Sequence, residues 1–317
     1  MGYSVEDNGS RRYKINSKRE VVSPVTGCDY YVDRVKSRLG LLAMVRGRIF
    51  HPVDMPDDPL KVHFDNGWSA PAASYYGTAS KMAARGIATA TFDSYHFPRR
   101  IDMKDPLYGA ESGGMAMIDI MDDVVGDGET ARIGHSTGAL VSWRLALKHD
   151  NTQYVIGHAP VGIQHRNMDK VYMDHMKEMI KDEFYIYIKS LPKDRFGASV
   201  AAEFLALNTS DPSRLVRQVK MLFKGPDLAP MLAKAHEKDI LNGLIFLEDD
   251  KFFHLQDQLD VLGRKQHLVD DVHIIDDARH LHPNLYPTRD AEVRIAALNS
   301  LRSIRRSREK LPKVSGE

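Results

Sequence analysis

A serine between two glycines, in the pattern Gly-x-Ser-x-Gly at residues 134–138, constrains the fold of this chain most strongly. Glycines two positions away on each side leave room for a chain that turns sharply, with Ser136 at the apex in a strained backbone conformation. Residues 130–133 fit a short buried strand, and apolar residues recur at helical spacing over 140–147. The pattern therefore predicts a strand, a tight turn at Ser136 and a helix.

Predicted strands alternate with predicted helices along most of the chain. We expect strands at 40–50, 60–64, 87–92, 130–133, 154–156, 244–247 and 272–275, and further helices at 72–85, 116–125 and 290–305. Such alternation is typical of an α/β fold, in which a mostly parallel central sheet carries helices on both faces.

The alternation stops between residues 164 and 242, where helix formers and methionines are divided by prolines. We interpret 164–242 as an inserted helical cap, which leaves 26–163 and 243–305 as the α/β core. Residues 1–25 are expected to form a flexible N-terminal arm, and 306–317 a disordered basic tail.

The composition argues against several classes of partner. The formal net charge of +1 gives no electrostatic case for nucleic acid, and no apolar run is long enough for stable insertion into a membrane. The polar N-terminal residues lack the apolar segment of a signal peptide, and the single cysteine, Cys28, fits a reducing compartment. We therefore expect a cytoplasmic protein, and the sequence leaves its oligomeric state open.

The residues needed to activate a serine occur after it in the chain. A serine hydroxyl is a weak nucleophile until a base takes its proton, and that base is usually a histidine oriented by a carboxylate. Asp250 follows the predicted strand 244–247, and His280 follows the predicted strand 272–275. Both lie just past the carboxyl end of a strand, the edge where open α/β sheets place their sites.

Neighbouring residues compete for these roles. Glu248 and Asp249 stay open as alternatives to Asp250, and His282 as an alternative to His280. His135 is either a packing residue beside Ser136 or part of a pocket. No spacing of histidines and carboxylates indicates a metal site, and no glycine-rich phosphate loop is present, so we expect neither a metal nor another cofactor.

Residues from about 42 to 301 resemble proteins with the α/β-hydrolase fold, in particular capped serine hydrolases of the esterase and lipase type. Asn66-Gly67-Trp68 stands where that family often has His-Gly-x, and residues 134–138 match its nucleophile elbow. Residues 247–253 are similar to its segment of a strand followed by Gly-x-x-Asp, and Ala278-Arg279-His280 is similar to its Ala-Gly-His.

The resemblance implies a role for five residues. Ser136 would be the nucleophile, His280 the general base and acid, and Asp250 the carboxylate that orients the histidine. The backbone N–H groups of Thr137 and Trp68 would form the oxyanion hole, which stabilises charge that develops in the transition state.

The chain also departs from the family pattern. Asn66 replaces the usual histidine, so its loop must be held differently, and Arg279 replaces the glycine before His280. If Arg279 faced the pocket, an anionic group on the substrate would be plausible; the alternative is an ordinary surface arginine. Gly67 and His158 complete the set of possible pocket residues, although His158 is as plausible in the core.

The resemblance implies hydrolysis of a small-molecule carboxylic ester, with an apolar acyl group suggested by the composition of the cap. The same triad can also transfer an acyl group to an acceptor other than water, hydrolyse a carbon–carbon bond, form peracids or cleave cyanohydrins. A different class of function is a non-catalytic receptor that keeps the pocket.

Overall fold

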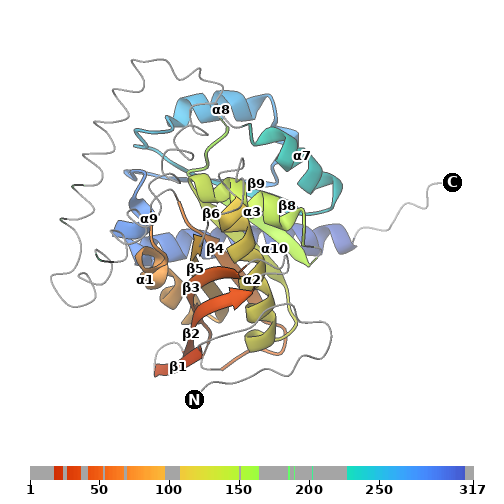
Figure 1. Cartoon of the computed structure of the whole chain (residues 1–317). Coiled ribbons are helices and arrows are strands. Elements are labelled where there is room, and N and C mark those ends of the chain that lie inside the picture. Colours follow the sequence, from red (N-terminus) through yellow and green to blue (C-terminus); the bar gives the residue numbers. More distant parts are fainter. Residues whose placement is uncertain are drawn as a thin grey trace.

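The computed structural model describes residues 18–23, 27–36, 42–52, 54–67, 70–96, 108–149, 151–163 and 227–310, with the single residues 185, 189 and 202. In this part of the chain the strands form one nine-stranded sheet in the order β1-β2-β3-β5-β4-β6-β7-β8-β9 (Figure 1). The strands are β1 Lys18–Ser23, β2 Gly27–Lys36, β3 Leu42–Phe50, β4 Leu60–Asp65, β5 Ile87–His96, β6 Thr130–His135, β7 Thr152–His158, β8 Leu241–Leu247 and β9 Asp271–Ile275.

Six neighbouring strands, from β5 through β4, β6, β7 and β8 to β9, run parallel to one another. The other three pair antiparallel at one edge, β1 with β2, β2 with β3, and β3 with β5. The predicted α/β fold with a mostly parallel sheet is therefore confirmed. The carboxyl ends of the six parallel strands therefore lie at one edge of the sheet.

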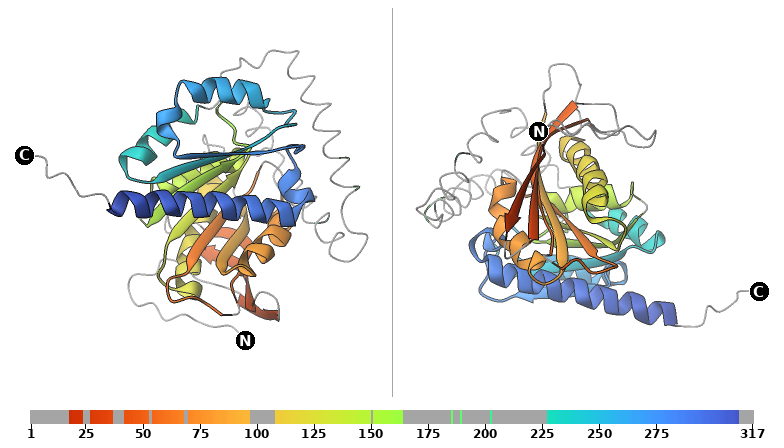
Figure 2. Two further views of the ribbon diagram at one scale, coloured as in Figure 1. Left: turned by 180° about the vertical axis from the view of Figure 1, so that it is seen from behind. Right: turned by 90° about the horizontal axis from the view of Figure 1, so that it is seen from below.

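Helices cover both faces of the sheet, and this explains why every residue of β4, β6 and β8 is buried. Helices α1 (Tyr76–Ala83) and α10 (Pro287–Lys310) lie together on one face, where α10 crosses the sheet in the left view of Figure 2. The opposite face carries α2 (Tyr108–Val125), α3 (Thr137–Ala146), α7 (Ala229–Glu237) and α8 (Leu255–Gly263). The short helices are η1 Ala72–Tyr75, η2 Gln266–Leu268 and α9 His282–Leu285.

On the face of α3 and α7, the Asn242 side chain makes buried polar contacts within a largely apolar cluster. The Trp143 indole N–H donates to the Asn242 side-chain oxygen at 2.8 Å. The amide nitrogen of Asn242 donates in turn to the carbonyl oxygens of Leu232 at 3.2 Å and Leu268 at 3.0 Å. Asn242 thus ties α3, α7 and η2 to strand β8 without an unpaired polar atom in its amide.

Two described segments, one near each end of the chain, lie in regular elements where we had expected none. Residues 18–23, placed in a flexible arm, form β1, because an edge strand is stabilised by backbone bonds that a polar sequence can also make. Residues 306–310, placed in a disordered tail, continue α10. Arg308 and Lys310 lie in its last turn, where cations interact favourably with the helix dipole.

The predicted cap falls mostly outside the described residues, which resume at Asp227. Residues 227–242, which we had assigned to the cap, pack on the core instead. Leu228, Leu232 and Ala235 are buried in the same apolar cluster as Trp143 of α3. Residues 227–242 therefore belong to the core and not to the cap.

Among the described residues, no helix combines the length and the apolar composition that crossing a bilayer requires.

Candidate active site

Ser136 occupies a strained turn between strand β6 and helix α3, with φ 54° and ψ −119°. A positive φ in a residue that carries a side chain costs on the order of 1–3 kcal/mol. A Cβ at Gly134 would lie 2.4 Å from the Ala139 Cα, and a Cβ at Gly138 would lie 2.0 Å from the carbonyl oxygen of Asp65. Only glycine permits these approaches, so both glycines of the motif are explained by the turn, as the sequence predicts.

The neighbouring strand β7 holds this turn in place. The Ser136 N–H donates to the carbonyl oxygen of His158 at 2.9 Å, and the Val161 N–H donates to the carbonyl oxygen of Ser136 at 3.3 Å. Thr137 opens helix α3, and N–H groups in the first turn of a helix have no partner within the helix. Helix α3 therefore offers the Thr137 N–H no partner of its own.

Asp250 and His280 form a buried pair on the loops that follow β8 and β9. The Nδ1 atom of His280 lies 2.8 Å from Oδ2 of Asp250. The other carboxylate oxygen, Oδ1, accepts hydrogen bonds from the N–H groups of Phe252 at 2.8 Å and Phe253 at 3.1 Å. Since both oxygens have donors, the carboxylate is fixed in an orientation that faces the imidazole.

Three aromatic rings enclose the imidazole of His280. Its centroid lies 4.7 Å from the Phe252 ring, 5.2 Å from the Phe253 ring and 5.0 Å from the ring of His135, which directly precedes Ser136. These contacts leave His280 only 7% exposed. They exclude water from around the Asp250 pair, and hydrogen bonds are electrostatically stronger in such a medium than in water.

The competing residues lie elsewhere. Asp249 and Glu248 are exposed, and Glu248 accepts a hydrogen bond from the Asp277 N–H at 3.0 Å. His282 is 1% exposed, but it lies beside His158 and not at Asp250. The structure thus brings Asp250 and His280 together and leaves their sequence neighbours outside the pair.

Asn66 holds the loop after β4 against strand β5. Its amide nitrogen donates to the Phe92 carbonyl oxygen at 2.8 Å and to Oδ1 of Asp93 at 3.2 Å. Its amide oxygen accepts a hydrogen bond from the Thr91 hydroxyl at 3.3 Å. These bonds explain how the loop is held although the usual histidine is missing. Trp68, the second expected oxyanion-hole donor, lies outside the described residues.

Comparison with solved structures finds the same fold in other proteins. A membrane phospholipase A, described as a novel bacterial virulence factor, is 13% identical with a TM-score of 0.60, over 90% of this chain and 86% of that one. A bromoperoxidase from Bacillus anthracis is 12% identical with a TM-score of 0.58, over 89% of this chain and 100% of that one. A thermophilic esterase from Thermogutta terrifontis is 14% identical with a TM-score of 0.54, over 90% and 99%.

The chain has the α/β-hydrolase fold. No model of a known protein family matches the sequence, and the comparison with curated proteins gives no match. At these identities the likeness is one of fold.

Beneath the elbow of this α/β-hydrolase fold lies a buried ion pair that sequence reasoning missed. Arg132 on β6 donates to the two carboxylate oxygens of Asp65 at 2.7 Å and 3.0 Å, and the Ser142 hydroxyl on α3 donates to Oδ2 of Asp65 at 2.5 Å. The network joins the end of β4, the strand before the elbow and the helix after it. The network therefore supports the elbow. Because its members come from three separate elements, no local sequence pattern predicts it.

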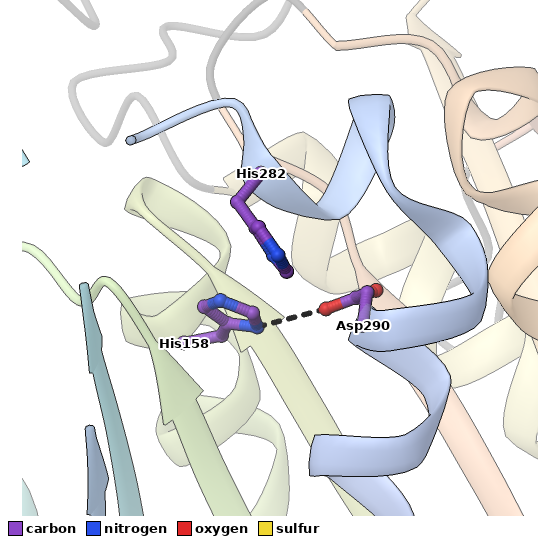
Figure 3. A group of neighbouring side chains, drawn as sticks. All are labelled: His158, His282 and Asp290. Carbon is purple, nitrogen blue, oxygen red and sulfur yellow. Dashed lines mark ion pairs between the residues drawn. The ribbon is translucent and has the colours of Figure 1, made fainter. Parts of the chain in front are cut away.

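A second cluster that the sequence did not reveal consists of His158, His282 and Asp290 (Figure 3). One ligand atom from each lies within 4.8 Å of the others, and all three residues are buried. This separation could admit a metal ion. However, both carboxylate oxygens of Asp290 already have partners. Oδ1 accepts from Nε of Arg294 at 2.9 Å and lies 3.2 Å from Nδ1 of His158. Oδ2 accepts from the Thr78 hydroxyl at 2.8 Å.

A guanidinium bonded to that carboxylate repels a divalent cation, so we interpret the cluster as a structural network that fastens α10 to the core. Burial lowers the pKa of His158, and it lowers the pKa of His282 to about 4. Burial alone would raise the pKa of Asp290, but Arg294 and His158 outweigh it and hold that pKa below its usual range. At neutral pH the cluster thus pairs one carboxylate with one guanidinium and two neutral imidazoles.

Two of the expected pocket residues can now be placed. His158 is fully buried in this cluster beneath the elbow. Arg279 is exposed, and its carbonyl oxygen accepts a hydrogen bond from the His282 N–H at 2.8 Å.

Proposed function

We propose that this protein is a serine hydrolase that cleaves a carboxylic ester through an acyl-enzyme on Ser136. One observation carries the proposal: the buried 2.8 Å contact between His280 Nδ1 and Asp250, at the same sheet edge as the strained serine. A serine at a positive φ and a buried carboxylate–histidine pair supply, in chain order, a nucleophile, an acid and a base.

In acylation, the Ser136 hydroxyl attacks the ester carbonyl carbon while His280 takes the hydroxyl proton. Because Nδ1 of His280 faces Asp250, Nε2 is the nitrogen left for this transfer. Asp250 stabilises the imidazolium that forms. The N–H groups of Thr137 and Trp68 donate to the oxyanion of the tetrahedral intermediate. Collapse of that intermediate breaks the bond to the alkoxide oxygen, and His280 returns its proton to the departing alcohol.

In deacylation, His280 acts again as a base and takes a proton from water, whose oxygen attacks the acyl-enzyme carbonyl. The second tetrahedral intermediate releases the carboxylic acid, and the proton returns to Ser136 through His280. The cycle needs no group beyond the chain and water. Each step uses the same base and the same pair of N–H donors.

The substrate class belongs to the proposal as well. The Thermogutta terrifontis neighbour is an esterase, and the apolar, methionine-rich composition of 164–226 fits a cap over a pocket for an acyl group of modest size. Methionine adapts to irregular shapes, so such a cap would tolerate several related acyl groups. The substrate is thus a small-molecule ester with an apolar acyl chain.

The proposal is tested with a fluorophosphonate probe and a panel of esters of increasing acyl length. The wild-type protein should be labelled once and should hydrolyse short and medium esters. Ser136→Ala should lose labelling and lower kcat by a factor on the order of 10⁶. Ser307→Ala, which changes an exposed serine on α10, is the matched control and should behave as wild type. A wild-type protein that is folded but not labelled would instead be a non-catalytic receptor.

A further inference from the structure

Two buried side chains that the mechanism does not use, Tyr75 and His135, connect the loops on either side of Ser136. The Gly67 N–H lies 3.2 Å from the Tyr75 hydroxyl oxygen. That oxygen lies 2.8 Å from Nδ1 of His135, and Nε2 of His135 lies 2.9 Å from the carbonyl oxygen of His280. The chain of contacts runs from the loop after β4, through the elbow, to the loop after β9.

The donors and acceptors along this chain can be assigned from chemistry. The carbonyl oxygen of His280 can only accept, so Nε2 of His135 carries a proton and donates it. Burial, with the neighbouring His280 and His158, lowers the pKa of His135 well below its usual value, so its imidazole is neutral and Nδ1 is an acceptor. The Tyr75 hydroxyl therefore donates to Nδ1 and accepts from the Gly67 N–H.

We propose that Tyr75 and His135 are positioning residues, whose hydrogen-bonded bridge sets the spacing between the oxyanion-hole loop, the nucleophile and the catalytic base. The inference rests on the proposed function. The bridge touches the proposed machinery at three positions, each of which is next to a proposed catalytic residue in the sequence or part of one. Gly67 precedes Trp68, His135 precedes Ser136, and the last acceptor is the backbone of His280 itself.

The bridge is packed tightly enough to act as a spacer. Tyr75 is 1% and His135 2% exposed. A Cβ at Gly67 would lie 2.9 Å from Nδ1 of His135 and 3.4 Å from the Tyr75 hydroxyl oxygen, so the loop rests directly on the bridge. The Tyr75 ring also makes an edge contact with Phe64 of β4 at 6.3 Å between centroids. A side chain at position 67 would thus displace either the loop or the bridge.

The bridge should affect the transition state more than substrate binding. Misplacing a catalytic group by about 1 Å can cost about 10²-fold in rate, whereas a pocket formed elsewhere keeps its affinity. Tyr75→Phe removes the hydroxyl and leaves the Gly67 N–H and Nδ1 of His135 unpaired. We expect kcat for a short ester to fall about 10- to 100-fold, with KM changed less than about twofold.

Position 135 offers a rescue that a merely structural role would not predict. His135→Gln keeps one N–H donor for the His280 carbonyl oxygen and one oxygen acceptor for the Tyr75 hydroxyl, whereas His135→Leu keeps neither. We expect the glutamine variant to retain most of kcat and the leucine variant to lose as much as Tyr75→Phe. Equal losses in both variants would overturn the proposal.

The matched control is Tyr154→Phe. Tyr154 is buried near the start of β7, and its hydroxyl donates to Glu129 at 2.7 Å, away from the carboxyl edge of the sheet. The Tyr154→Phe variant loses a hydrogen bond from a tyrosine hydroxyl, as Tyr75→Phe does, and its kcat should stay at the wild-type value. A loss in Tyr154→Phe as large as in Tyr75→Phe, or full kcat in Tyr75→Phe, would refute the positioning role.

Hydrogen exchange of the Gly67 amide separates this proposal from the proposed function. In the wild type the amide should exchange slowly, in Tyr75→Phe at least tenfold faster, and in Tyr154→Phe as in the wild type. If the wild type does not react with a fluorophosphonate, the proposed function fails. The exchange rate of the Gly67 amide then tests by itself whether the bridge holds the loop. Accelerated exchange in Tyr75→Phe then supports the bridge, and equal exchange overturns it.

Discussion

Replacing Asp250 with asparagine tests the pair at the centre of the proposed mechanism, because the structure determines how the new amide would lie. Oδ1 of Asp250 accepts hydrogen bonds from the N–H groups of Phe252 and Phe253. In Asp250→Asn only the amide oxygen can satisfy these donors, so the NH₂ group must face Nδ1 of His280. An NH₂ group donates, which forces Nδ1 to accept and places the imidazole proton on Nε2.

That tautomer cannot take the proton of Ser136, and the imidazolium also loses its carboxylate. A change of this kind lowers kcat by about 10⁴-fold, which corresponds to about 5.5 kcal/mol of transition-state stabilisation at about 1.36 kcal/mol per factor of ten. The fold should survive, since both backbone N–H bonds are kept. The free energy of unfolding should fall by no more than about 1–3 kcal/mol.

The assay compares kcat/KM for a short ester, the rate constant for fluorophosphonate labelling and the urea midpoint in Asp250→Asn and Asp249→Asn. Asp249 is exposed and carries the same charge one residue away. The kcat/KM of Asp249→Asn should therefore stay within about threefold of the wild-type value. The reasoning is refuted if Asp249→Asn loses as much activity as Asp250→Asn. It is also refuted if folded Asp250→Asn has a kcat/KM within about tenfold of the wild-type value.

Three further predictions concern stability and the loop after β4. Gly138→Ala places a Cβ 2.0 Å from the Asp65 carbonyl oxygen and should lower the free energy of unfolding in urea by more than about 3 kcal/mol. Gly263→Ala, whose Cβ would meet nothing within 4 Å, should change that free energy by less than about 1 kcal/mol. Similar losses in the two variants would contradict the elbow geometry. Burial lowers the pKa of His282 to about 4. The unfolded state therefore binds a proton between about pH 6.5 and 4 that the folded state does not, and stability falls as the pH falls through that window. Urea unfolding at pH 7 and 4.5 should show a smaller loss for His282→Leu than for the wild type, and an unchanged or larger loss would rule out this contribution. Asn66→Ala removes the bonds that hold its loop on β5 and should lower kcat about tenfold; unchanged ester kinetics would show that the loop is held by other contacts.

Sequence alone was enough to predict the elements that depend on local pattern. The strand, turn and helix around Ser136 follow from a short segment that fits a buried strand, two glycines and a helical repeat, all within residues 130–147. The alternation of strands and helices predicted the parallel sheet, because the period of apolar residues differs between the two. Sheet topology then implied that residues following neighbouring strands, such as Asp250 and His280, would share one edge.

Tertiary structure alone decided which side chains meet at that edge. It paired His280 with Asp250 and left Asp249 exposed, a choice between adjacent residues that periodicity cannot make. Strand β1 was also missed, since edge pairing depends on a partner strand and not on its own polar sequence.

The bridge through Tyr75 and His135, and the cluster around Asp290, join residues that lie far apart in the chain. Their sequence neighbourhoods carry no common motif. Whether a buried histidine donates, accepts or binds a proton depends on which carbonyl, hydroxyl or guanidinium lies opposite it, and only the folded chain brings those groups within hydrogen-bonding distance.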